Sequence, residues 1–226
     1  MARGAKRFPN KKSRRPRRAE SSSRFQDLSA ALAQIGKTFY QRGWVFGTSG
    51  NLSAVVSREP LRLSITATGL DKGALDPSQF LEIDGTARVI RGSGQPSAET
   101  GLHLAIVRAC GAGAVLHTHS MWSTFLSEAF SADGAVMLQG FEMLKGLSGV
   151  RTHEHREALP ILENSQDIAA LSEKVRVLLQ SNAGIHGFLL RRHGLYTWGS
   201  DLAEAKRHVE ILEFLLEVLG RSRSGV

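Results

Sequence analysis

Apolar residues recur every three or four positions in two stretches of the chain, one between residues 25 and 39 and one between residues 205 and 219. This spacing places the apolar side chains on one face of a helix. We therefore expect an N-terminal helix that begins at one of the serines 21–23 and ends before Gly43, and a C-terminal helix that begins near Asp201. The two apolar faces consist of Phe25, Leu28, Leu32, Ile35 and Phe39, and of Ala205, Val209, Leu212, Leu216 and Leu219.

The middle of the chain changes to a period of two, which is typical of strands. Residues 52–56 and 61–65 form a predicted antiparallel hairpin, and further strands are expected at 80–83 and 86–91. Beyond a glycine-rich loop at 92–96, the pattern predicts helices at 99–110, 120–130 and 167–181 and strands at 114–118, 187–192 and 195–198. Hairpins mixed with alternating helices and strands predict a three-layer α/β/α fold, in which helices flank a central mixed, mainly antiparallel sheet. We expect a single domain over residues 23–226.

The composition narrows the class of protein. With 226 residues and 42% hydrophobic content, the chain is long enough to bury a core of its own. Its single cysteine, Cys110, excludes an intrachain disulfide, so a reducing cytoplasmic compartment is expected. No stretch approaches the roughly 18 to 20 apolar residues of a membrane span, and no apolar segment follows the N-terminal charges as in a secretion signal. We expect neither a membrane protein nor a secreted one.

The net charge of +8 comes from the N-terminus. Residues 1–18 contain nine lysines or arginines and no acid, which leaves twenty basic and twenty-one acidic residues for the remainder. Residues 1–22 contain little that could bury apolar surface, so we expect a disordered basic tail. Binding of nucleic acid is expected, if at all, only through this tail, which also lacks the apolar face of an organelle transit peptide.

The tripeptide His117-Thr118-His119 is a candidate metal site. On a strand, residues i and i+2 point to the same side, so the two imidazoles would project together from the end of the apolar strand 114–118. His193 follows another apolar strand and offers a third neutral ligand, which gives the arrangement that catalytic zinc prefers. For an isolated pair of this kind, two hydrogen-bonded histidines at a strand end are the alternative.

The other histidines include a rival pair, His153 and His155. This pair lies in the polar stretch 151–157, where no apolar strand is predicted, so we expect a solvated surface segment there. No partner is predicted for the remaining three, which are His103, His186 and His208.

Two loops are rich in small residues with free N–H and hydroxyl donors, one at residues 47–51 and one at residues 66–73. Loops of this kind can surround an anionic group, and Lys72 adds a positive charge. Ordinary turns have the same composition and are the alternative. Neither loop has the spacing of a Walker P-loop or of the GxGxxG fingerprint, so a nucleotide is not expected.

Six short strings occur in the order that is typical of the class II aldolase and adducin-head superfamily. They are GTSGNLS at 47–53, TATGLDKG at 66–73, PSAET at 96–100, HTHS at 117–120, FEMLKG at 141–146 and RRHGLYTWG at 191–199. The chain resembles this superfamily over nearly everything after about residue 24. Within it, the strings FEMLKG and LDKG are similar to those of the hydro-lyases of methionine salvage. The basic tail lies outside the resemblance.

The resemblance implies a class II aldolase-like fold and one zinc ion per subunit, bound by His117, His119 and His193. It implies that Glu99 serves as base or extra metal ligand and that Glu142 is the general acid and base, although Glu142 could also be a surface carboxylate beside Lys145. The phosphate would be bound by Asn51, Thr68, Gly69 and Ser97, with help from Ser49 and Lys72. Aldolases of this group tend to have two serines before the glutamate, and here Ala98 replaces the second. A cyclic homotetramer with sites between subunits is also implied.

The implied reaction is the zinc-dependent dehydration of 5-methylthioribulose 1-phosphate to 5-methylthio-2,3-dioxopentyl 1-phosphate and water. A zinc ion with three neutral ligands keeps its full charge, which favours removal of the C3 proton. Glu142 would donate a proton to the departing C4 hydroxyl, and Glu99 could instead take the first proton. One alternative is a class II aldolase or 4-epimerase for another ketose phosphate. Another is a non-catalytic, adducin-like interaction domain, which would be expected to lack the histidine ligands.

Overall fold

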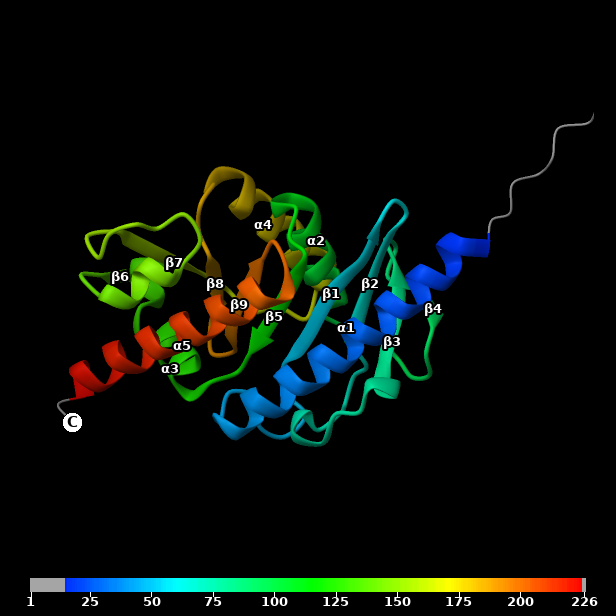
Figure 1. Ribbon diagram of the computed structural model, residues 1–226. Helices are drawn as coiled ribbons and strands as arrows, with labels where there is room; N and C mark the ends of the chain where they lie inside the picture. The colour runs from blue at the N-terminus through cyan, green and yellow to red at the C-terminus, as the bar shows by residue number, and fades with distance from the viewer. Residues whose placement is uncertain (1–14, 225–226) are drawn as a thin grey trace, which may run out of the picture.

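The computed structural model describes residues 15–224, and nine strands of this region form one sheet. The strands are β1 (Asn51–Arg58), β2 (Leu61–Thr66), β3 (Phe80–Asp84), β4 (Val89–Arg91), β5 (Ala114–Thr118), β6 (Ala135–Gln139), β7 (Arg156–Leu162), β8 (Gly187–Leu190) and β9 (Gly194–Gly199). Their order across the sheet is β4-β3-β2-β1-β5-β9-β8-β7-β6 (Figure 1). Neighbouring strands are antiparallel except β7 and β8, which run parallel. The predicted mixed, mainly antiparallel sheet is confirmed.

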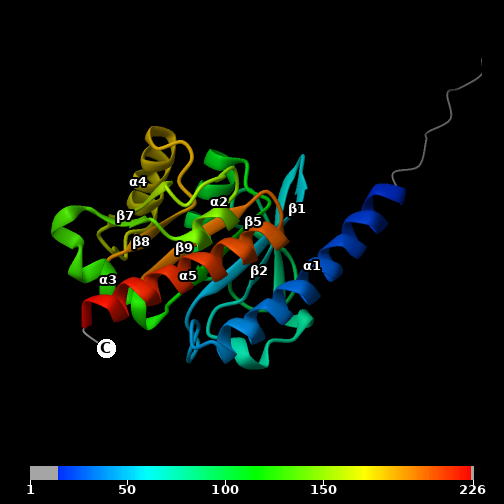
Figure 2. The same cartoon turned by 60° about the vertical axis from the view of Figure 1, so that its left-hand side comes forward.

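Helices cover both faces of this sheet. They are α1 (Arg15–Gln41), α2 (Thr100–Cys110), α3 (Met121–Ala129), α4 (Ile168–Ser181) and α5 (Leu202–Ser224), with short 3₁₀ helices η1 (Lys72–Ala74), η2 (Pro77–Gln79), η3 (Ser131–Asp133) and η4 (Glu142–Gly146). Apolar side chains of α1, α3 and α5 fill two buried clusters on one face, and those of α2 and α4 fill a third on the other. Figure 1 looks onto the face covered by α1 and α5, and Figure 2 shows the layers from another side. The α/β/α layering is therefore confirmed.

The first helix begins earlier than the sequence indicates. It starts at Arg15 instead of at the serines 21–23, so residues 15–22 of the predicted disordered tail are helical, while residues 1–14 lie outside the described part. The local composition allows this, because a proline is tolerated in the first helical turn and arginine, alanine and glutamate are good helix formers. Ser23 is not a cap: its hydroxyl donates to the Asp27 carboxylate one turn further along the helix, at 3.4 Å.

The other end of the first helix follows the prediction. The helix ends at Gln41, and Gly43 takes the left-handed conformation with φ of +77° while its N–H donates to the carbonyl of Tyr40. Its predicted apolar face is buried or packed against the core along its whole length. Within the described residues, no helix is both long enough and apolar enough to cross a membrane.

The sequence pattern does not predict the strands β6 and β7, which form the edge of the sheet beyond β8. The stretch 151–157, predicted as a solvated surface segment, runs into β7 at Arg156. The prediction is wrong for Glu157, which is 1% exposed. A charged residue interrupts the apolar pattern of this strand, and the reason that it is tolerated is a pair of histidine partners from elsewhere in the fold.

Candidate metal and phosphate site

The three predicted histidine ligands come from two neighbouring strand ends. His117 lies in β5 and His119 directly follows it, while His193 occupies the turn between β8 and β9. Because β9 pairs antiparallel with β5, with Thr118 opposite Leu195, the turn before β9 returns to the end of β5. Gly194 permits this close approach, since a Cβ there would lie 2.0 Å from the Thr118 carbonyl oxygen.

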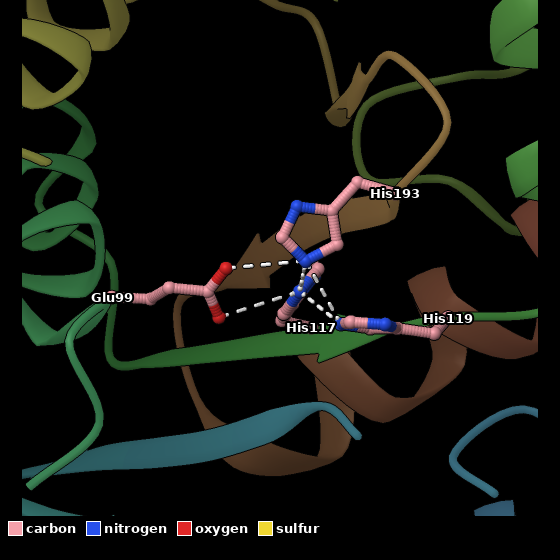
Figure 3. A group of neighbouring side chains, drawn as sticks. All are labelled: Glu99, His117, His119 and His193. Atoms are coloured by element: carbon pink, nitrogen blue, oxygen red, sulfur yellow. Dashed lines mark hydrogen bonds and ion pairs between the residues drawn. The ribbon is translucent and has the colours of Figure 1, made fainter. Parts of the chain in front are cut away.

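The Nε2 atoms of the three imidazoles converge (Figure 3). They lie 2.7 Å apart between His117 and His119, 3.1 Å between His119 and His193, and 3.4 Å between His117 and His193. Bonds of about 2.0–2.1 Å to a tetrahedral zinc ion would separate such nitrogens by about 3.3 Å. The convergence therefore fits a metal ion bound by three imidazoles.

Hydrogen bonds on the outer sides of two rings fix which nitrogen faces the centre. The Nδ1 of His117 donates to the carbonyl oxygen of Leu195 at 2.9 Å, and the Nδ1 of His193 lies 3.2 Å from the amide oxygen of Asn164. An N–H on Nδ1 leaves the lone pair on Nε2, which is the form that a metal ligand requires.

Burial keeps these imidazoles neutral. It lowers the pKa of His117 well below its ordinary value and lowers the pKa of His119 to about 3, and in both cases the neighbouring imidazoles add to the effect. Burial also lowers the pKa of His193, against the opposing influence of Glu99. Three neutral nitrogens aimed at one point suit a cation, whose charge they leave uncompensated.

Glu99 forms the fourth side of the cluster. One carboxylate oxygen lies 3.2 Å from Nε2 of His193 and the other lies 3.6 Å from Nε2 of His117. Glu99 occupies the N-cap position of α2, but its side chain makes no capping hydrogen bond and turns into the cluster instead (Figure 3). A carboxylate at this distance can ligate a metal ion or accept a proton from a bound molecule.

A buried hydrogen-bond chain holds Glu99 in place. The Asn51 amide donates to the Glu99 carboxylate at 2.6 Å, and its oxygen is bonded to Nε2 of His103. Burial lowers the pKa of His103 to about 3, so this ring is neutral and its Nδ1 accepts from the Ser53 hydroxyl at 2.7 Å. His103, for which the sequence offered no partner, therefore positions Asn51. The register of β1, which places Asn51 opposite His117, brings Asn51 to the histidine cluster.

The residues predicted to bind phosphate lie around one pocket beside this cluster. The pocket has a volume of about 160 Å³ and is lined by both small-residue loops together with Glu99, His119 and His193. All six predicted phosphate residues belong to its lining: Ser49, Asn51, Thr68, Gly69, Lys72 and Ser97. Donors that suit an anion and donors that suit a metal thus share one cavity.

Lys72 supplies a buried positive charge beneath the two loops. Its ammonium donates to the carbonyl oxygens of Thr48, at 3.1 Å, and Leu70, at 2.7 Å, which joins the loops to each other. Burial lowers the pKa of Lys72 to about 8, although the nearby Asp71 opposes the shift. An ammonium has three N–H groups, so one donor is left for a ligand in the pocket.

Glu142 does not lie at this pocket in a single copy of the chain. It is in η4, its side chain is 72% exposed, and the Lys145 ammonium donates to it at 2.7 Å. That hydrogen bond lowers the pKa of Glu142 below its ordinary value. The pocket lining in the described residues does not include it, so its predicted role depends on an arrangement beyond one copy.

The rival pair of histidines is divided between two places. His153 is exposed and lies 3.8 Å from the Glu142 carboxylate. His155 instead contacts Glu157, which also contacts His186. His186 therefore has a partner that sequence reasoning missed, because the strand that carries Glu157 was missed.

Comparison with known proteins agrees with the fold and with the strings that carry the resemblance. The family model described as "Class II Aldolase and Adducin N-terminal domain" matches residues 30–219. The chain belongs to this family. It is 41% identical to a protein of Sorangium cellulosum named methylthioribulose-1-phosphate dehydratase, over 88% of this chain and 94% of that protein. A protein of the same name from Methylococcus capsulatus is 43% identical, over 86% of this chain and 93% of its own length.

Two solved structures have the same fold as this chain. A putative aldolase/epimerase/decarboxylase from Escherichia coli, YgbL, is 28% identical and superimposes with a TM-score of 0.73, covering 86% of this chain and 88% of its own. An L-fuculose 1-phosphate aldolase gives a TM-score of 0.72 over 88% of this chain and 87% of its own, at 21% identity. The predicted class II aldolase-like fold is confirmed.

Proposed function

We propose that this chain catalyses the dehydration of 5-methylthioribulose 1-phosphate to 5-methylthio-2,3-dioxopentyl 1-phosphate and water, as a zinc-dependent hydro-lyase of methionine salvage in the cytoplasm. The observation that carries the proposal is the shared pocket, where a three-histidine cluster adjoins two loops suited to a phosphate. The identity of 41–43% with relatives named for this reaction, over most of both chains, supports it.

The three imidazoles suit a zinc ion, which when bound would act as a Lewis acid on the carbonyl and adjacent hydroxyl of the ketose. His117 and His193 each hold a ring nitrogen away from the centre through an outer hydrogen bond, so their orientation is set before any ligand arrives. The protein thus provides a rigid, neutral donor set at one end of the pocket.

The other end of the pocket would hold the phosphate. Hydroxyl and backbone donors of Ser49, Thr68 and Gly69 surround it, and Lys72 adds its charge from below. Anchoring the phosphate here would orient the ketose with its carbonyl towards the histidines. Ser97 would donate its hydroxyl to the phosphate as well. The next residue, Ala98, has no hydroxyl to offer.

Two carboxylates divide the proton transfers in this proposal. Glu99 lines the pocket beside two of the imidazoles, so we assign to it the removal of the C3 proton. Glu142 protonates the C4 hydroxyl, which leaves as water, and the resulting enol takes up a proton at C4 to give the diketone. The Asn51 amide, which donates to Glu99, keeps that carboxylate aimed at the pocket.

Glu142 would reach the pocket from a second copy of the chain. It is exposed in one copy, and its neighbour Met143 is 41% exposed. Near the pocket loops, Phe46 is 62% exposed. Exposed apolar side chains beside both halves of the site fit an interface between copies, in line with a homotetramer whose sites lie between subunits.

A second candidate reaction is cleavage or epimerisation of a ketose phosphate, which the likeness to YgbL favours. The same donors would serve it. The two reactions give different products from one substrate. An aldolase would break the C3–C4 bond and release dihydroxyacetone phosphate, and an epimerase would leave the mass unchanged.

The test is to incubate the zinc-loaded protein with 5-methylthioribulose 1-phosphate and follow the products by liquid chromatography, which separates epimers, coupled to mass spectrometry. A diketone phosphate that is lighter than the substrate by one water, and that no longer forms after chelation, is the expected result. Dihydroxyacetone phosphate, or an epimer of the same mass, would replace the proposal with the second candidate. An unchanged substrate would contradict it.

Complementation tests the role of a second copy. The variants His117→Asn and Glu142→Gln are expected to be inactive alone, because each lacks one half of the site. If the halves come from different copies, co-expression in equal amounts restores about one site in four by random mixing. No recovery in mixed oligomers would place Glu142 and His117 of one site in the same copy, contrary to the proposal.

A further inference from the structure

A second cluster of metal-ligating side chains lies at the opposite end of β8 from the candidate active site. It consists of His155, Glu157 and His186. Glu157 is the second residue of β7, and His186 directly precedes β8. β7 and β8 run parallel and pair Ile161 with Leu189 and Leu162 with Leu190, so the residue before β8 lies alongside the early part of β7. His193, by contrast, follows the last residues of β8.

The three side chains meet at one carboxylate oxygen. Glu157 Oε2 lies 2.9 Å from Nε2 of His155 and 3.0 Å from Nδ1 of His186, and all three ligating atoms lie within 4.8 Å of one another. Glu157 is 1% exposed and His186 is 8% exposed, while His155 remains half-buried towards solvent. Two imidazoles and a carboxylate form a common donor set for zinc.

The hydrogen bonds of His186 require a positive charge between its ring and Glu157. Its Nε2 faces the carbonyl oxygen of Ser148 at 2.8 Å, and a carbonyl can only accept, so the proton of a neutral ring is on Nε2. The lone pair of Nδ1 would then point at Oε2 of an ionised carboxylate. Either a second proton or a metal ion must lie between these two atoms.

Both oxygens of the Glu157 carboxylate contact His186. One of them, Oε1, accepts the backbone N–H of His186 at 2.8 Å. Oε2 is therefore the oxygen that faces both imidazoles.

His155 favours a metal ion over a proton. His155 brings a second imidazole nitrogen to within 2.9 Å of the oxygen that His186 contacts, so the cluster has the three donors that a divalent ion needs. The fourth nearby group, His208, takes no part, because its Nδ1 donates to the carbonyl of Trp198 and its Nε2 accepts the N–H of Ser148. The Ser148 carbonyl, in turn, orients His186 as an outer partner does at a metal ligand.

We propose that His155, Glu157 and His186 form a second site for a divalent transition metal such as zinc, at the opposite end of β8 from the candidate active site. The site would join β7 to β8 and, through Ser148, would hold the segment that carries Glu142. It concerns metal binding alone and does not depend on the proposed reaction.

The experiment measures bound zinc in a chain whose first site has been disabled. The double variant His119→Asn/His193→Asn removes two of the three first-site ligands. After loading with zinc and gel filtration, it is expected to retain close to one zinc ion per chain. Adding His155→Asn is expected to lower this to less than about one-tenth, since a single remaining imidazole and carboxylate bind too weakly.

His153→Asn, added to the same double variant, is the matched control. It removes a histidine of the same polar stretch that lies against Glu142 and not against Glu157. Retention of zinc with His153→Asn and its loss with His155→Asn would support the second site. Equal zinc content in the two variants, or no zinc in the double variant, would overturn it.

Thermal unfolding gives a readout that a misfolded variant cannot imitate. Saturating zinc should raise the unfolding temperature of the double variant and of its His153→Asn form, because a ligand bound only by the folded state stabilises it. It should leave the His155→Asn form unchanged. A zinc-dependent rise of the same size in the His155→Asn form would contradict the proposal. Turnover is measured separately, so failure of the proposed reaction leaves this test intact.

Discussion

The two ends of β8 carry clusters of the same residue types that differ in where the carboxylate lies. At the candidate active site, three neutral imidazoles converge and Glu99 flanks them beside a pocket. At the other end, Glu157 is buried at the centre and the imidazoles approach it from either side. The first arrangement leaves charge and space for a substrate, whereas the second neutralises its charge within the protein.

This difference suits the first cluster to a reaction and the second to a structural role. An ion held only by neutral ligands keeps its full charge for a bound ketose, and Glu99 is left free to exchange protons. An ion bound to Glu157 would be partly neutralised and would mainly link strands. Variants at the two ends should therefore separate loss of turnover from loss of stability.

The largest effect is expected from His117→Asn. Turnover should fall by about 10⁴-fold or more, because the proposed zinc ion would contribute several kcal/mol to the reaction as a Lewis acid. His155→Asn, at the other cluster, should keep turnover within a few-fold of the unchanged protein. Steady-state rates together with bound zinc for each variant check this. Comparable losses of turnover in both variants would mean that the second cluster also takes part in the reaction.

Glu142→Gln should have the next largest effect. General acid catalysis contributes about 10²–10⁴-fold, so turnover is expected to fall by about 10³-fold. Bound zinc should stay the same, because Glu142 touches neither cluster. Glu154→Gln, which neutralises another exposed carboxylate of the same region, is the control and should retain its rate. A Glu142→Gln enzyme as fast as this control would remove Glu142 from the mechanism.

The first cluster was predictable from sequence because its signals are local. His117 and His119 stand at alternate positions at the end of an uninterrupted apolar strand, and Ala114–Thr118 is the strand observed. His193 follows a second apolar run. The spacing of apolar residues also predicted the bounds of α2, α3, α4 and α5 to within a few residues, because each helix buries one continuous apolar face.

The second cluster was not predictable because it depends on pairing between distant strands. Glu157 breaks the apolar pattern of β7, and only the parallel alignment with β8 brings His186 to it. The role of His103 was not predictable for the same reason. His103 acts on Glu99 through Asn51, and Asn51 lies about fifty positions before His103 in the sequence. The pairing of β1 with β5 places Asn51 beside the histidine cluster. Long-range contacts of single polar residues leave no periodic signal.

Two buried carboxylates should give pH dependences of opposite sign. Burial raises the pKa of Glu213 to about 7, despite hydrogen bonds from Ser120 and Thr118. The folded state then keeps a proton that the unfolded state has released, so the free energy of unfolding falls as the pH rises from about 4.5 through 7. Glu213→Gln removes this loss, and the variant should gain up to about 3 kcal/mol relative to the unchanged protein.

Glu157→Gln should show the reverse. The pKa of Glu157 is lower in the folded protein than in the unfolded chain. Its ionised carboxylate therefore stabilises the fold at pH values above the pKa of the unfolded chain, and this stabilisation is lost as the pH falls through the lower pKa of the folded protein. The variant should therefore lose stability relative to the unchanged protein at neutral pH and approach it in acid. Denaturant unfolding from pH 8 down to below about pH 4 measures both differences. Slopes of the same sign in the two variants would contradict this contrast between the carboxylates.

The smallest effect is expected at His103, which acts on the first cluster only through other residues. His103→Leu removes the donor to Asn51, so Glu99 loses its fixed orientation while the three imidazoles of the first cluster keep theirs. Loss of an outer partner of this kind typically costs about 10–100-fold, and we expect it in kcat with little change in KM. His103→Gln keeps an N–H donor near the position of Nε2 and should recover most of the rate. If Leu and Gln at this position gave equal rates, His103 would fill space without positioning Glu99.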